Sequence, residues 1–231
     1  MKLLGLDSSA VSASCAITEN GRILAQAAVN TKITYSQTLM PLVESVAKAA
    51  GIALSEIDAF AVSNGPGSFT GLRISVSAVK GLAFALDKPV SGVSTLLSLA
   101  HNLTGQNVIA CPVMDARRGE VYNALFEVNG ETVTRLTPDR AISLDDLSKE
   151  LQQFADRKII LVGDGAELAN CQLSIVHCPL SIVNCSLSVA GEIIRWQNAA
   201  SVCFAAEKFT TAKELMPVYI RKPQAERERE K

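Results

Sequence analysis

The residues that could carry chemistry are concentrated in a glycine-rich segment of the first half of the chain. Gly65, Gly67 and Gly71 follow a short apolar run and precede a long apolar segment with helical periodicity. Such a turn can present backbone N–H groups at a helix N-terminus, where phosphate groups bind. The spacing matches neither the Walker pattern nor the dinucleotide G-x-G-x-x-G pattern. The segment therefore either binds phosphate or forms a tight turn in which Ser68 or Thr70 caps the next helix.

A carboxylate and hydroxyl groups stand at the end of the opening apolar run. Asp7 and Ser8 lie where a strand over 2–7 ends. In sugar kinases and actin-like proteins a turn of this kind faces phosphate and Mg²⁺. In the alternative interpretation, the side chains bond to the nearby backbone and only shape the turn. Asp7, Ser8, Gly65 and Gly67 are the candidate phosphate-binding residues.

Other catalytic arrangements are not supported by the residue pattern. The chain has two histidines, His101 and His177, far apart in sequence. Metal sites require three or four ligands, so we predict no metal. No Ser/His/Asp arrangement with a recognisable spacing exists, so a peptidase is disfavoured and no catalytic residue is assigned. The segment 163–165 is the one candidate for a second phosphate loop.

Composition indicates a globular protein with a sizeable core. Of the 231 residues 48% are hydrophobic and 19% charged, and the formal net charge is −1. No basic field would recruit nucleic acid or an acidic membrane. The six cysteines form no CxxC pair, and no signal peptide or bilayer-spanning apolar run is recognised. These features predict a soluble cytoplasmic protein.

Hydrophobic periodicity predicts two α/β lobes, because each half opens with paired strands and then alternates helix and strand. The predicted strands cover 2–7, 11–18, 23–29, 59–63, 89–93, 108–114, 120–128, 132–136 and 158–162. The predicted helices cover 36–50, 69–85, 94–102, 144–154, 189–197 and 199–206. The polar stretch 101–107 is the candidate boundary, which gives domains 1–104 and 105–231. The charged turn 115–120 is either a solvated hairpin tip or a partner contact.

The predicted helix 69–85 has an unusual composition. Arg73 and Lys80 are its only charges, and small residues occupy several of its faces. A helix with so narrow a polar stripe should be buried on more than one side. The covering surface can come from the same domain or from another chain, and the pattern leaves both possibilities open.

Four segments carry a resemblance to a known family. The stretch 65–73 (GPGSFTGLR), with 4–9 (LGLDSS) before it and 115–122 (DARRGEVY) and 217–221 (PVYIR) after it, resembles the bacterial TsaB (YeaZ) family. The likeness covers nearly the whole chain, and the glycine–Phe–Thr motif is highly specific to that family. A local repeat, 173–178 followed by 180–185, departs from the family pattern.

The resemblance implies an ASKHA (actin-like ATPase, ribonuclease H-like) fold of two lobes. It also implies a noncatalytic scaffold or activating subunit of the complex that transfers a threonylcarbamoyl group to N6 of adenosine 37 in tRNAs reading ANN codons. The implied partners are a TsaD-like paralogue in a heterodimer and a TsaE-like ATPase, with a homodimer when the chain is alone. The near-neutral charge indicates that tRNA is held mainly by the partners. No cofactor is expected, except ATP or ADP at the partner complex.

Under this interpretation the two helices of the first lobe bind the partner. The predicted interface residues are Ser36, Leu39, Met40, Val43, Gly71, Leu72, Ser75, Val76 and Val79. The competing hypothesis is an ATP-binding ASKHA-type ATPase or small-molecule kinase that uses Asp7 and the glycine segment. Affinity of the isolated chain for ATP and Mg²⁺ distinguishes the two.

Overall fold

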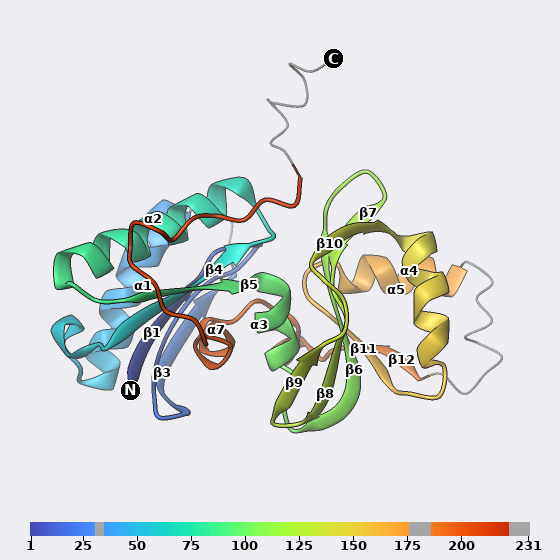
Figure 1. Cartoon of the computed structure of the whole chain (residues 1–231), viewed down its shortest axis with the longest axis horizontal. Helices are drawn as coiled ribbons and strands as arrows, with labels where there is room; N and C mark the ends of the chain where they lie inside the picture. The colour runs from blue at the N-terminus through green and yellow to red at the C-terminus, as the bar shows by residue number, and fades with distance from the viewer. Residues whose placement is uncertain (31–34, 176–185, 222–231) are drawn as a thin grey trace, which may run out of the picture. The chain divides into compact units, whose positions relative to one another are not determined.

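The computed structural model describes residues 1–30, 35–175 and 186–221, and the chain divides into two compact units (Figure 1). The first unit combines Met1–Thr95 with the chain from Gln197 onward, and the second is Leu96–Trp196. This division differs from the expected domains 1–104 and 105–231 in two ways. The boundary lies after Thr95, and the chain from Gln197 belongs to the first unit. Its helix α7 (Ala199–Phe204) packs on the opening strands.

The first unit contains a five-stranded sheet in the order β3-β2-β1-β4-β5. Its strands are β1 (Lys2–Asp7), β2 (Ala13–Glu19), β3 (Arg22–Val29), β4 (Ala59–Gly65) and β5 (Val90–Ser94). The first three are antiparallel and joined by short turns, whereas β4 and β5 run parallel to their neighbours. Asn20 and Gly21 have positive φ angles of 48° and 78° in the turn between β2 and β3. This turn confirms the hairpin between the second and third predicted strands.

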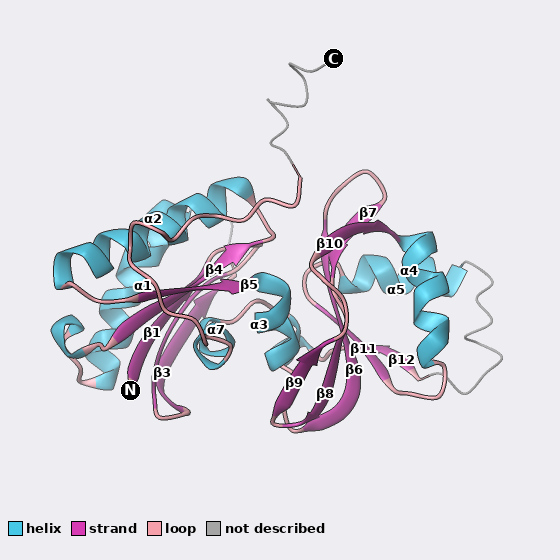
Figure 2. Ribbon diagram, viewed as in Figure 1, coloured by secondary structure: helices cyan, strands magenta, loops and turns pink. Residues whose placement is uncertain are grey.

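Helices cover both faces of this sheet. Both faces of strand β1 are buried, and successive side chains point to opposite faces because a strand has a two-residue period. Leu4 and Leu6 share a core with α1 (Tyr35–Ala50) and α2 (Phe69–Leu86). Leu3, one position away, packs with Cys203 of α7. Figure 2 shows the three helices around the strands, and a short 3₁₀ helix (Leu54–Glu56) precedes β4.

The second unit has a sheet in the order β10-β7-β6-β11-β12; in addition β8 pairs with β6, and β9 pairs with β8. Its strands are β6 (Gln106–Asp115), β7 (Glu120–Asn123), β8 (Phe126–Gly130), β9 (Thr132–Arg135), β10 (Arg140–Ser143), β11 (Ile159–Val162) and β12 (Leu187–Val189). Its helices are α3 (Thr95–His101), α4 (Leu144–Leu151), α5 (Ala166–Ile175) and α6 (Glu192–Arg195), with a 3₁₀ turn at Gln152–Phe154.

Three predictions for the second unit need correction. The predicted strand 120–128 is two strands, because β7 pairs with the end of β6 and β8 with its beginning. The predicted helix 189–197 is helical only over Glu192–Arg195. The strand Arg140–Ser143 was not predicted.

Most of the duplicated sequence 173–185 lies outside the described residues. The turn between β6 and β7 is closed by Asp115, whose Oδ1 accepts from the Arg117 N–H at 2.6 Å.

Helix α2 would qualify as a membrane span by length and composition alone, contrary to the prediction that no such run exists. The core helix of a soluble protein meets the same criterion. One face of α2 is buried in the first unit, through Gly71, Leu72, Ser75, Val76, Val79 and Ala83.

The return of α7 to the first unit gives a stability prediction for Gly5. A Cβ atom at this position would lie 2.5 Å from the Ala199 carbonyl oxygen and 2.6 Å from the Cys203 Sγ atom. We expect Gly5→Ala to lower the free energy of unfolding by about 1–3 kcal/mol, because backbone must shift to make room. Urea denaturation measures the change.

The matched control is the same substitution in α2, Gly81→Ala. No atom lies within 4 Å of a Cβ at that position, so the variant should be as stable as the parent or up to about 1 kcal/mol more stable. Equal stability of the Gly5 variant and the parent would contradict the packing of α7 on β1.

Candidate functional site

The glycine segment joins β4 to α2, and its donors are used within the chain. The Ser68 hydroxyl caps α2 by accepting from the Gly71 N–H at 3.3 Å. The Ser68 N–H donates to the Ser9 carbonyl at 2.7 Å. Of the two capping candidates, Ser68 therefore fills the role. Two of the amide groups that a phosphate would need are engaged by the protein itself.

The space beside each glycine is filled by a carbonyl oxygen of the same unit. A Cβ at Gly71 would lie 1.9 Å from the Ser8 oxygen, and one at Gly67 2.4 Å from the Ser9 oxygen. At Gly65, where φ is 138°, it would lie 2.1 Å from the Val218 oxygen. Carbonyl oxygens repel an anion, so this arrangement suits close backbone approach better than phosphate binding.

The Asp7 carboxylate is fully buried and bonded inside the protein. Its Oδ1 accepts from the Ser9 N–H at 2.8 Å and from the Ser9 hydroxyl at 2.7 Å, and its Oδ2 accepts from the Ser63 hydroxyl. Burial raises the pKa of Asp7, and the hydrogen bonds from Ser63 and Ser9 oppose that rise. The neighbouring Ser8 hydroxyl is also buried and donates to the Gly71 carbonyl at 2.9 Å. The four phosphate candidates thus lie together, and their polar groups tie β1, β4 and α2 to one another.

The second glycine turn, 163–165, is packed in a similar way within its own unit. A Cβ at Gly163 would lie 2.4 Å from the Val113 oxygen, and the Gly165 N–H donates to that same oxygen at 3.0 Å. The glycines of this turn therefore also pack closely against the backbone of β6.

The end of the described chain forms a third part of the site. We call residues 210–221 the strap; Figure 1 shows it running alongside α2. Thr210 and Val90 exchange backbone hydrogen bonds of 2.8 and 2.9 Å, so the strap begins by pairing with the edge of β5. The Lys80 ammonium of α2 then donates to the Leu215 carbonyl at 3.0 Å.

The strap ends on the glycine segment. The Val218 N–H donates to the Asn64 carbonyl at 2.6 Å, and the Asn64 side-chain amide donates to the Met216 carbonyl at 3.2 Å. The Tyr219 ring stacks on Phe69 with centroids 4.7 Å apart, and its hydroxyl accepts from the Arg73 Nε at 2.9 Å. The sequence predicted an extended segment at 217–221 but not its contact with α2, because an irregular segment has no periodicity that reveals its neighbour.

Most of the predicted interface residues are buried within the first unit. Leu39, Val43, Gly71, Leu72, Ser75, Val76 and Val79 are buried in the first unit. The prediction chose the apolar face of each helix, and that face packs in the core of its own unit. Ser36 and Met40 of α1 are exposed, and their contact with a partner stays a prediction.

The outward face of α2 carries small residues. Thr70, Ser77, Gly81 and Ala85 are exposed, and at about 100° per residue they share one side of the helix, which the exposed Phe84 borders. Their spacing of four and seven residues was visible in the sequence. The prediction noted the small residues of this helix but placed the interface on Gly71 and Ser75, which the structure buries.

Nucleophile and metal candidates are few in the described part of the chain. Burial raises the thiol pKa of Cys15, Cys111 and Cys203 to about 12, so these cysteines are protonated at neutral pH. Residues 1–30, 35–175 and 186–221 contain no group of three or more His, Cys, Asp or Glu that could hold a metal. His177 lies outside these ranges.

Burial of Asp7 predicts a pH-dependent difference between the parent and Asp7→Asn. The pKa of Asp7 in the folded protein is raised above its ordinary value of 3.8. Because the buried side chain resists ionisation, the parent loses stability as the pH rises from 3.8 through the raised pKa. The amide has no such cost and keeps the shape of the carboxyl. We expect Asp7→Asn to gain stability relative to the parent with rising pH in urea titrations between about pH 4 and pH 8.

Asp146→Asn is the control of opposite sign. The Ser143 hydroxyl and the Lys149 ammonium lower the pKa of this exposed carboxyl, so its contribution to stability is lost as the pH falls through the lowered value. Asp146→Asn should therefore lose stability relative to the parent with rising pH. If the stability of Asp7→Asn relative to the parent stayed constant or fell with rising pH, the raised pKa of Asp7 would be contradicted.

Comparison with known proteins places this geometry in a family. The family model for tRNA N6-adenosine threonylcarbamoyltransferase matches residues 23–227. A Bacillus subtilis protein named tRNA threonylcarbamoyladenosine biosynthesis protein TsaB is 32% identical over 168 residues, which are 73% of each chain.

Solved structures agree with this assignment. A Pseudomonas aeruginosa protein, described as uncharacterized with similarity to peptidase YeaZ, has a TM-score of 0.77 at 26% identity. The match covers 95% of this chain and 99% of that one. A ROK hexokinase from Thermus thermophilus, with a TM-score of 0.50 and 15% identity over 89% of this chain and 97% of its own, shares the fold alone. The predicted ASKHA fold is confirmed, and the chain belongs to the TsaB (YeaZ) family.

Proposed function

We propose that the chain is a noncatalytic scaffold or activating subunit in threonylcarbamoyladenosine biosynthesis. In this proposal it pairs with a TsaD-like paralogue, which transfers the threonylcarbamoyl group to N6 of adenosine 37 in tRNAs reading ANN codons. Family membership supports the pathway. The observation that carries the noncatalytic role is the engagement of Asp7, Ser8 and the Ser68 and Gly71 amides in bonds within the chain.

The exposed face of α2 is the proposed contact with the paralogue. Small side chains at Ser77, Gly81 and Ala85 permit the close approach of a second helix, since the distance between helix axes depends on the side chains at the contact. Met40 of α1 is 39% exposed and supplies an apolar anchor. This surface replaces the buried residues of the sequence-based prediction.

For the rest of the assembly we propose the following arrangement. A TsaE-like ATPase completes the complex, and the chain forms a homodimer when alone. Because the net charge is −1, tRNA is held mainly by the partners. In this proposal the chain itself binds no cofactor, any site for ATP or ADP belongs to the partner complex, and the protein acts in the cytoplasm.

Gly81→Arg tests the interface without disturbing the core. A Cβ at Gly81 meets no atom within 4 Å, so the variant should fold, while the long side chain should block a neighbouring helix. We expect the dissociation constant for a purified TsaD-like paralogue to rise by at least about tenfold, measured by calorimetry.

Gly191→Arg is the matched control, because a Cβ at this exposed glycine of the second unit also meets no atom within 4 Å. It should leave the affinity unchanged. If Gly81→Arg formed the heterodimer as well as Gly191→Arg does, the proposed α2 interface would be wrong.

The alternative function, an ATP-binding ATPase or small-molecule kinase, predicts a different result for the isolated chain. We expect calorimetry with ATP and Mg²⁺ to detect no binding, since the glycine segment faces its own carbonyl oxygens. Micromolar affinity that disappears in Asp7→Ala would overturn the noncatalytic proposal. The same affinity retained in Asp7→Ala would place a nucleotide elsewhere on the chain.

A further inference from the structure

The strap and the adjoining flank of α2 both carry exposed apolar side chains, and Lys80 joins the two elements. Phe84 of α2 is 79% exposed, and Met216 and Val218 of the strap are 62% and 52% exposed. The Met216 sulfur lies 4.0 Å from the Lys80 ammonium, and Phe84 follows Lys80 by one helical turn. We call these residues, with Arg73, the strap surface. Single exposed apolar residues are common, but a contiguous set marks a site of interaction.

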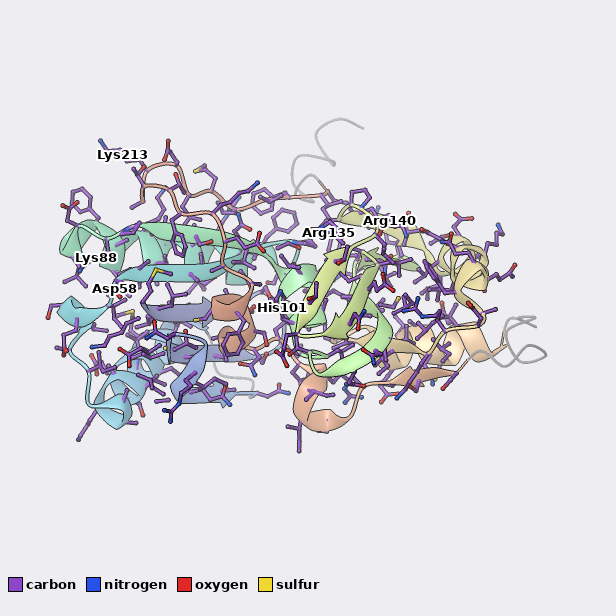
Figure 3. The ribbon with its side chains drawn as sticks, turned by 60° about the horizontal axis from the view of Figure 1, so that its bottom comes forward. Asp58, Lys88, His101, Arg135, Arg140 and Lys213 are labelled. Carbon is purple, nitrogen blue, oxygen red and sulfur yellow. The ribbon has the colours of Figure 1, made fainter. Side chains whose placement is uncertain are left out.

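A groove of about 720 Å³ opens at the Phe84 end of this surface. Phe84 of α2 and Phe209, which lies just before the strap in the chain, are both part of its lining. Lys88 and Lys213, both labelled in Figure 3, are also part of its lining. Two aromatic side chains beside ammonium groups suit an apolar anchor that is flanked by carboxylates.

The charges of the surface favour an acidic partner. Residues 69–86 and 215–221 contain three cations, Arg73, Lys80 and Arg221, and no carboxylate. The groove adds two lysines and two carboxylates. One of these, Glu214, accepts hydrogen bonds from the Thr210 hydroxyl and from the amide and hydroxyl of Thr211, and these bonds lower its pKa. Glu214 thus stays ionised and stabilises the turn of the strap, and the groove by itself is neutral by count. The positive excess of the surface comes from Arg73, Lys80 and Arg221.

A protein fits this surface better than a nucleic acid does. Nucleic-acid affinity rests on many phosphate contacts, whereas here few cations are spread along an apolar strip. The Lys80 ammonium is bonded to the Leu215 carbonyl and the Arg73 guanidinium to the Tyr219 hydroxyl. The overall charge of −1 supplies no wider basic field.

We propose that the strap surface binds an acidic segment of a protein partner, which seats a large apolar side chain between Phe84 and Phe209. On the helix Phe84 borders the small-residue face, because it follows Ser77 by seven residues, whereas Phe209 and Met216 lie outside α2. The proposal therefore goes beyond the pairing with a paralogue, and its test uses no paralogue.

The probes are two labelled peptides of about ten residues that share one pattern of Phe and Leu. One peptide has Glu at every charged position and the other has Lys. In fluorescence anisotropy with the full chain, we expect the Glu peptide to bind at least about tenfold more tightly than the Lys peptide. Its affinity should fall at high salt, because exposed charges are screened.

Surface variants locate the contact. Phe84→Ser and Met216→Ser each change an exposed side chain, and each should lower the affinity of the chain for the Glu peptide by at least about fivefold. Ile193→Ser is the matched control, since Ile193 is 95% exposed in the second unit; it should leave the affinity unchanged. Thermal unfolding midpoints equal to that of the parent verify that the variants are folded.

Three results would overturn the proposal. The first is equal binding of the Glu and Lys peptides. The second is an equal loss of affinity in Ile193→Ser and Phe84→Ser. The third is an oligouridine probe that binds more tightly than the Glu peptide and loses affinity in Met216→Ser, which would assign the surface to RNA.

Discussion

The first unit depends on the close approach of glycine backbone to carbonyl oxygens of other segments. Gly67 and Gly71 lie against the turn that follows β1, and Gly65 lies against the strap. Any side chain at these positions would overlap a backbone oxygen, which cannot move without moving its strand or its strap. The position of the start of α2 against β1 and the path of the strap over the end of β4 therefore both depend on these contacts.

The polar groups of the turn complete this arrangement. Asp7 bridges β1 to β4 through Ser63, and Ser8 reaches the first turn of α2. A buried carboxylate is costly, and it is tolerated here because several donors surround it. The same residues that could serve a phosphate thus hold the unit together, while α2 presents two adjoining sides to the outside. One side carries small residues, and the other is flanked by the strap with its exposed Met216.

Local signals in the sequence predicted much of this structure, whereas distant contacts could not be predicted. The extent of α2, its Ser68 cap and the β2–β3 turn follow from nearby residues, and the family motifs indicated the fold. The apolar face of α2 was predicted to contact a partner, and in the structure it packs in its own unit. The two cases look alike in the sequence because a core face and an interface face have the same periodicity. The return of α7 and of the strap to the first unit has no local signal. The glycines were ambiguous for a physical reason: a phosphate and a carbonyl oxygen both require the absence of a Cβ.

The most direct test of the central claim is a reconstitution of threonylcarbamoyl transfer to tRNA from the other components of the pathway. The reaction is measured without this chain, with the parent chain, and with Asp7→Asn. We expect transfer to require the chain, and Asp7→Asn to restore it as fully as the parent, because Asp7 acts within the fold and not on a substrate. Loss of transfer with a folded, heterodimer-forming Asp7→Asn chain would show that the carboxylate takes part in the chemistry.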